Sequence, residues 1–398
     1  MRVGAGISTE ADASVAAERA ARATAERLDG SPADLAVLFA SGEHLQEAEA
    51  LLEIVRGTLS PAALIGCGAG GVLGEGRELE AGNAVAVWAA AFQGRGRARP
   101  FHATVVGNGE ERELDGLPVP GAHPEADAAN GPGGGVIMLA DPYSFPADLA
   151  LERIAQLAPG APVVGGLASA RTPAGATLFY GDEVRPEGAV GVCLEGVELL
   201  PCVSQGAAPI GREMTITAAR GNMILELAGR PALRAIEQTI SELDLHERAL
   251  VATGLLIGIV IDPGRPEYEQ GDFLVRGVLG ADPDTGSVAV GAPVTTGQVV
   301  RLHARDARSA DDDLRRELRV RAAALGGNAP AGALVFSCNG RGRAMFGVAD
   351  HDAALVRREL GGAPTAGLFA AGEIGPVGGR SFLHGFTATV AVFPGGAA

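Results

Sequence analysis

The sequence contains no lysine, so every strongly basic side chain is an arginine. This absence excludes chemistry that depends on an amine side chain. A Walker A phosphate loop, a pyridoxal Schiff base and the ATP-contacting lysine of protein kinases are all ruled out. We therefore expect none of these enzyme classes, and we expect no cofactor.

Cysteine and histidine are scarce and widely spaced. The 4 cysteines form no CxxC pair and the 7 histidines show neither HxH nor HExxH spacing, so the sequence predicts no metal site. The most apolar run, residues 249–261, is shorter than the roughly 20 residues that a bilayer-spanning helix needs. The first residues lack the apolar core of a signal peptide. We expect a cytoplasmic protein that contacts no membrane.

Acidic residues outnumber basic ones, 48 to 32, and the formal net charge is -16 at pH 7. Such a charge repels nucleic-acid phosphates and anionic lipid surfaces, so we do not expect nucleic acid as a partner. The chain has 398 residues, of which 47% are hydrophobic, and this is enough for two packed domains.

Three segments repeat one order of elements. Each starts with an apolar strand, at 34–41, 134–141 and 332–338, and continues with an amphipathic helix, a proline and a second apolar strand. A glycine-rich loop and a returning strand close each segment. The pattern predicts an α/β fold built from repeated β-α-β-β units, in two related domains, residues 1–200 and 201–398, each with a mixed sheet flanked by helices.

The region between the second and third segments has another character. Residues 222–240 have the pattern of a helix, and the Asp-Pro-Asp-Thr-Gly turn at 282–286 predicts a β-hairpin. The polar residues 107–135, within the first half, predict an exposed loop.

Two loops in the last third of the chain point to a known family. ALVFSCNGRG, residues 333–342, and GLFAAGEIGPVGGRSFLHGF, residues 367–386, pair a Ser-Cys-x-Gly-Arg loop with a Gly-Glu-Ile-Gly-Pro loop. This pairing resembles the C-terminal domain of the FIST family, and LAVLFAS (35–41) followed by PAALIGCGAGGVLGEG (61–76) is similar to its N-terminal domain. The resemblance implies a FIST N-terminal domain (1–200), a FIST C-terminal domain (201–398), and a cytoplasmic sensory module for signal transduction whose small ligands include amino acids.

The loop around Cys338 carries the predicted binding site. Gly340 and Gly342 permit close backbone approach, and Arg341 offers a planar fork that matches a carboxylate. Together with the carboxylate of Glu373, this arrangement suits an anionic or zwitterionic, amino-acid-like ligand. The structural alternatives are an internal ion pair between Arg341 and Glu373, and glycines that serve only a tight turn. The predicted ligand-binding residues are Cys338, Asn339, Gly340, Arg341, Glu373, Arg380, His384 and Cys67.

Cys338 also supports a second hypothesis, in which it is a catalytic nucleophile. Arg341 could lower the pKa of its thiol, and His384 could act as the base in acyl or related transfer. A buried thiol that only packs is the plain alternative. Whether the protein is an enzyme stays open, with binding favoured, and a third hypothesis is a protein-interaction scaffold that binds no ligand.

The sequence GCGAGG at 66–71 matches the GxGxxG pattern of dinucleotide sites. Such a site needs a helix to begin there, but Gly74, Gly76 and Gly82 oppose one, so we expect no nicotinamide or flavin. Cys67 in this loop is predicted either to line a second pocket or to pack in the core. Asp141, which ends the first strand of the second segment, is expected to cap the following turn.

Overall fold

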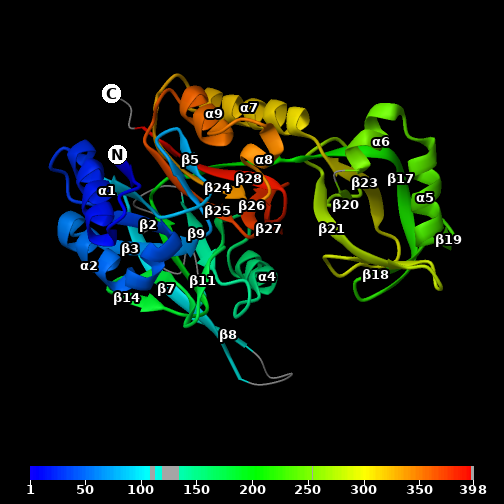
Figure 1. Ribbon diagram of the computed structural model, residues 1–398, viewed down its shortest axis with the longest axis horizontal. Coiled ribbons are helices and arrows are strands. Elements are labelled where there is room, and N and C mark those ends of the chain that lie inside the picture. The colour runs from blue at the N-terminus through cyan, green and yellow to red at the C-terminus, as the bar shows by residue number, and fades with distance from the viewer. Residues whose placement is uncertain (108–112, 119–133, 253, 396–398) are drawn as a thin grey trace. The chain divides into compact units, whose positions relative to one another are not determined.

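The computed structural model describes residues 1–107, 113–118, 134–252 and 254–395 (Figure 1). The chain forms two compact units. The first comprises Met1–Val203, Arg315–Leu383 and the residues from Ala388 onward, and the second comprises Ser204–Leu314 and His384–Thr387. Compactness in space is a different criterion from family domains, so the division into 1–200 and 201–398 stays a prediction. Within the described residues, no helix is long and apolar enough to cross a membrane.

The first compact unit confirms the mixed α/β fold and its repeated units. The first repeat contains β2 (Leu35–Ser41), α2 (Ala48–Leu59), β3 (Ala63–Ala69) and β6 (Ala84–Ala91). The second contains β9 (Gly134–Ala140), α4 (Ala147–Leu157), β10 (Val163–Leu167) and β15 (Ala189–Glu195). The third contains β24 (Pro330–Cys338), α9 (His351–Glu359), β25 (Thr365–Ala370) and β28 (Thr387–Pro394).

The strands pair in the same way in all three repeats. The first and second strands are parallel, and the returning strand runs antiparallel to the first. An outer strand then pairs with each returning strand: β1 (Arg2–Ser8) with β6, β7 (Arg97–Val106) with β15, and β16 (Leu200–Gln205) with β28. The exposed loop predicted at 107–135 lies mostly outside the described residues, apart from β8 (Glu113–Asp115), which pairs with β7.

Each sheet is completed by a hairpin from a different repeat. The hairpin of β4 (Val72–Gly74) and β5 (Arg77–Leu79) follows β3 in the chain but pairs with β25 of the third repeat. That of β13 (Leu178–Tyr180) and β14 (Glu183–Arg185) follows β10 but pairs with β3 of the first. That of β26 (Glu373–Val377) and β27 (Arg380–His384) follows β25 but pairs with β10 of the second. The exchange forms a closed cycle, and Figure 1 shows the blue strand β5 beside the orange and red strands of the third repeat.

A glycine at the same place in each repeat allows the first and second strands to approach closely. An added Cβ at Gly66, Gly165 or Gly367 would lie 2.0, 1.9 or 1.8 Å from a carbonyl oxygen of the partner strand. No larger residue fits at these distances without moving the backbone, so glycine is required in each second strand.

The core of the first unit lies between the sheets and beneath the helices. The inner faces of the three sheets share one apolar core that includes Phe39, Trp88 and Phe336. The helices α1 (Ala13–Leu28) and α2 cover the other face of the first sheet, and α4 covers that of the second. Next to the third sheet, α7 (Ala307–Ala324) and α9 lie side by side (Figure 1), joined by Arg319 Nε and Glu359 Oε2 at 2.9 Å.

The second compact unit is a closed sheet. Its order is β17 (Ala207–Arg220), β23 (Val299–Arg305), β20 (Leu255–Val260), β21 (Phe273–Asp282), β22 (Ser287–Val290) and β18 (Met223–Leu227), and β18 pairs back with β17. The helices α5 (Ala232–Glu242) and α6 (Leu245–Val251) belong to the same unit. The β-hairpin predicted at 282–286 is confirmed by β21 and β22.

The helix predicted over residues 222–240 is wrong in its first half. Residues 223–227 form β18, which pairs with β17 and β22, and the short β19 (Arg230–Pro231) follows before α5 begins. Gly229 adopts a positive φ of 74° and Pro231 cannot extend a helix backwards, so the helix starts at Ala232.

A buried histidine is enclosed in the second unit. His303 on β23 is 0% exposed, stacks edge-on against Phe273 with 4.7 Å between ring centroids, and lies against Gly258, which has no side chain. Its Nδ1 lies 3.1 Å from the carbonyl oxygen of Arg301, and its Nε2 makes no hydrogen bond within the described residues. Burial lowers the pKa of His303 to about 4, so the ring is neutral at pH 7.

Candidate functional site

The loop from Cys338 to Gly342, which we call the Cys338 loop, leaves the carboxyl end of β24. The backbone N–H of Arg341 donates to the carbonyl oxygen of Cys338 at 2.8 Å, and that of Gly340 donates to the Cys338 Sγ at 3.4 Å. Gly342 has a φ of 86°, which favours glycine. These bonds curl the chain tightly, and the short helix α8 (Arg343–Phe346) follows.

Arg341 turns inward from this loop. Its side chain is only 1% exposed and makes a two-pronged ion pair with Asp352, which is fully buried at the start of α9. Arg341 Nε lies 2.6 Å from Asp352 Oδ2, and Nη2 lies 2.9 Å from Oδ1. Burial lowers the pKa of Arg341, but the charges of Asp352, Cys338 and Glu373 outweigh it and raise the pKa above its ordinary value.

Asp352 is the centre of a buried polar network. Besides Arg341, it accepts a hydrogen bond from Ser337 Oγ at 2.9 Å, and His351 Nδ1 lies 3.0 Å from its Oδ1. The ring of Phe346 stacks on His351 with 3.5 Å between centroids, and the Arg341 Cζ lies 5.2 Å from the same Phe346 ring. Burial raises the pKa of Asp352, but Arg341 and His351 more than offset this and hold it below its usual value.

The exchanged hairpin β4–β5 closes the network from the other side. Glu78 Oε1 accepts from the backbone N–H of Ala353 at 2.9 Å, and the Glu78 N–H donates to Asp350 Oδ1 at 2.6 Å. Glu80 Oε1 accepts from the N–H of Arg343 at 2.8 Å. Burial, together with the negative charge of Asp352, raises the pKa of Glu78 to about 7. The first repeat therefore supplies two carboxyl groups to the third, one at α9 and one at the start of α8, directly after the Cys338 loop.

The other predicted ligand-binding residues lie in different surroundings. Asn339 is exposed at the tip of the loop. Glu373, 0% exposed, begins β26, where its charge influences Arg341. Arg380 is exposed just after the Gly-Gly turn of that hairpin, about 13 Å along the strand from Glu373 at about 3.3 Å per residue. His384 is buried at the end of β27 and groups with the second compact unit.

Cys67 does not reach a surface. It is 0% exposed in β3, within the central apolar core, and burial raises the pKa of its thiol far above the usual range. Of the two possibilities that the sequence left open for Cys67, this surrounding favours packing. Within the described residues, no cluster of three or more His, Cys, Asp and Glu side chains is arranged to hold a metal ion.

Sequence reasoning missed several members of the network, above all Asp352 and Glu78. Asp352 stands in the sequence Ala-Asp-His-Asp before a helix, where a capping role is the ordinary expectation. The useful signal was Arg341 itself, because a buried arginine needs a buried acid within reach. No local signal marks Glu78, since it arrives on an exchanged hairpin.

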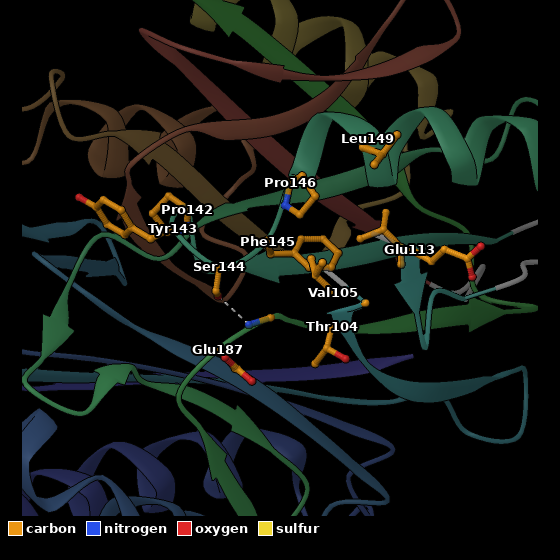
Figure 2. A pocket seen from close by; sticks show the side chains of 13 residues that line it. Thr104, Val105, Glu113, Pro142, Tyr143, Ser144, Phe145, Pro146, Leu149 and Glu187 are labelled. Carbon is orange, nitrogen blue, oxygen red and sulfur yellow. Dashed lines mark hydrogen bonds between the residues drawn. The ribbon is translucent and has the colours of Figure 1, made fainter. Parts of the chain in front are cut away.

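A pocket opens at the equivalent strand end of the second repeat (Figure 2). Asp141 there is fully buried and caps its turn as expected, accepting from the N–H of Ser144 at 3.0 Å and from Ser144 Oγ at 2.6 Å. Arg171 Nη1 lies 2.8 Å from Asp141 Oδ1. Ser144 Oγ also accepts from the N–H of Gly188 at 2.9 Å, which Figure 2 shows as a dashed line. These bonds satisfy Asp141 and fix the floor of the pocket.

This pocket, which we call the β9 pocket, has a volume of about 630 Å³. Its walls come from β7, β8, the loop after β9, the start of α4 and the turn before β15. Figure 2 shows Pro146 and Leu149 on the α4 side and Thr104 and Val105 on the strand side. No sequence pattern marks this pocket, because its walls come from distant segments.

The three-repeat unit with exchanged hairpins and the closed sheet define a two-part α/β protein, and its third repeat carries the Ser-Cys-x-Gly-Arg loop. A family model for the FIST N domain matches residues 34–230, and one for the FIST C domain matches residues 232–376. The chain belongs to the FIST family. FIST domains are associated with signal transduction and small-ligand sensing.

Proteins with similar sequences occur in mycobacteria. An uncharacterized protein of Mycobacterium tuberculosis is 45% identical over 395 residues, which cover 99% of this chain and 100% of its own length. An uncharacterized protein of Mycobacterium bovis is 44% identical over 394 residues, which cover 99% of each chain. The similarity therefore spans both family domains.

Proposed function

We propose that this protein is a cytoplasmic sensor that binds a small anionic or zwitterionic, amino-acid-like metabolite in a signal-transduction role. Family membership supports the sensory part of the proposal, since FIST domains have that general association. The Cys338 loop is the proposed binding site, with Arg341 as its main contact.

One observation carries this assignment: the Arg341 guanidinium is buried, yet its Nη1 makes no hydrogen bond within the described residues. A buried donor without an acceptor costs roughly 1–3 kcal/mol, and more when the group is charged. Asp352 holds Nε and Nη2 and so fixes the plane of the guanidinium and the direction of Nη1. A ligand carboxylate is the acceptor that would remove this cost most effectively.

A zwitterion fits the charges around Arg341 better than a simple anion. Glu373 is fully buried and close enough to raise the pKa of Arg341 through its charge. An amino acid would bring a carboxylate to Arg341 and an ammonium group towards Glu373. The ligand would then add no net charge to a buried region, which keeps the desolvation cost low.

The experiment is a thermal-shift screen with amino acids, followed through Trp88, the single tryptophan, which is buried in the first compact unit. At a concentration 100 times its dissociation constant, a ligand adds about 2.7 kcal/mol of stability. Arg341→Lys keeps the charge but loses the fork, so it should weaken binding about tenfold. Arg343→Lys, on an exposed neighbour, is the matched control. No shift with any amino acid, or equal shifts in both variants, would contradict the proposal.

A second candidate function, cysteine-dependent acyl or related transfer, has one specific observation in its favour. Cys338 Sγ accepts a hydrogen bond from the Gly340 N–H and interacts electrostatically with Arg341, and both interactions stabilise a thiolate. Iodoacetamide should then alkylate Cys338 fastest, with iodide leaving. The control is internal, because Cys67, Cys193 and Cys202 are all buried. If Cys338→Ser leaves the fast phase in place, this candidate fails; if His384→Ala does not slow it, His384 is not the base.

A further inference from the structure

We propose that the β9 pocket is a second binding site, and that it takes a small organic cation with an apolar body. The inference is independent of the proposed function, because none of the residues that line this pocket belongs to the Cys338 loop. At about 630 Å³ its volume lies within the roughly 300–1,000 Å³ range of small-molecule sites.

The middle of the pocket is apolar. Val105 on β7, Leu114 on β8, Phe145 in the loop after β9 and Leu149 on α4 line it together. Leu149 is 50% exposed, so its side chain is available to a ligand. These residues offer a hydrocarbon or aromatic body a surface that would otherwise face water.

The charge of the lining has one sign. Within the described part of the chain, the only charged residues that line the pocket are Glu113 and Glu187, and neither carboxylate forms an ion pair with another described residue. The nearby Asp141 differs, because Arg171 neutralises it. Two carboxylates that no described residue pairs with attract a positive group and repel an anion, so the charge of the described lining complements a cation.

The same charges orient the ligand. Arg171 Cζ lies 4.7 Å from the centroid of the Tyr143 ring, so a guanidinium group already lies against that ring and leaves it less open to a second cation. Figure 2 shows Tyr143 and Glu113 on opposite sides of the pocket, with Phe145 between them. The cationic group of a ligand therefore points towards Glu113, on the side away from Tyr143, and its apolar body covers Phe145 and Leu149.

Three probes with one aromatic body and different charges test this proposal: 2-phenylethylamine, 2-phenylethanol and 2-phenylacetate. Binding to the full chain is measured by calorimetry and by chemical-shift changes in residues of the pocket. We expect the amine to bind most tightly, the alcohol more weakly and the acid least. Glu113→Gln should weaken amine binding about threefold, because exposed ion pairs are worth less than about 1 kcal/mol. Glu187→Gln, on another side of the pocket, should weaken it less.

Two controls make the outcome decisive. Glu152→Gln removes an exposed carboxylate of α4 that does not line the pocket, and it should leave amine binding unchanged. Leu149→Ala should weaken the amine and the alcohol alike, since it removes only apolar contact. Equal binding of the amine and the acid, amine binding that survives the Glu113→Gln and Glu187→Gln double variant, or no binding by any probe would overturn the proposal.

Discussion

Replacing Glu78 with glutamine should stabilise the first compact unit, and the gain should grow as the pH rises. Glu78 is buried against Asp352, and its pKa is raised from 4.5 to about 7. Between pH 4.5 and pH 7, Glu78 therefore keeps its proton in the folded protein but has lost it in the unfolded chain. Stability from this group is complete below pH 4.5 and is lost as the pH rises through 7. Glutamine is uncharged at every pH and keeps the oxygen that accepts the Ala353 N–H.

The magnitude follows from these two pKa values. Each unit of difference corresponds to about 1.4 kcal/mol, and the difference here saturates above the folded pKa. Relative to the native protein, the gain from Glu78→Gln should rise from about 1 kcal/mol at pH 5 to about 3 kcal/mol at pH 8. Any effect that does not depend on pH, such as a small change in packing, cancels in the comparison.

The assay is urea unfolding at pH 5 and pH 8, followed by the fluorescence of Trp88, which reports the first unit. Glu53→Gln on the exposed face of α2 controls for the loss of one surface carboxylate. The reasoning about Glu78 is refuted if the difference between Glu78→Gln and the native protein is the same at both pH values.

Three further predictions concern other parts of the chain. Lowering the pH from 7 towards 4 should destabilise the second unit by up to about 3 kcal/mol, because the pKa of His303 is 6.5 in the unfolded chain and about 4 in the folded protein. His303→Gln should remove this dependence of stability on pH, as measured by hydrogen exchange in β20 and β23. Asp352→Asn should cost about 3–5 kcal/mol in urea unfolding, because it leaves a buried arginine without its counter-charge. Gly367→Ala should reduce the free energy of unfolding by about 3 kcal/mol and so lower the thermal midpoint. Gly57→Ala, in an open position on α2, should raise the midpoint.

The sequence predicted the repeated units well because their signals are local. Apolar runs, helical spacing and the proline before each second strand lie within one repeat, and the structure confirms the elements they predict. The helix predicted at 222–240 failed where residues 223–227 pair with distant strands, and such pairing overrides a local pattern. The glycines at 66, 165 and 367 are a local sequence sign of close contact between the first and second strands of each repeat.

The candidate site was predicted only in part. The Cys338 loop and its glycines follow from a strand that ends in small residues, and an internal ion pair between Arg341 and Glu373 is one of the structural alternatives that the sequence leaves open. The sequence offered Glu373 as the internal partner, but the two-pronged ion pair is made with Asp352. A strand-end arginine can turn towards any element that follows it, and only the packing of α9 decides which acid it meets. Glu78 and the β9 pocket depend on contacts between repeats, which periodicity does not encode.

Because each repeat gives its hairpin to the sheet of another repeat, each of the three sheets depends on a second repeat for its completion. Deleting any one repeat would remove the hairpin that completes the sheet of a second repeat. It would also leave the hairpin of the third without a strand to pair with. Both changes expose unpaired strand edges, which promote aggregation. During synthesis the β4–β5 pair must wait for β25, almost 300 residues later, before it is buried. Fragments cut at the repeat boundaries should therefore regain structure only when they are recombined, and a slow, concerted last step should dominate refolding.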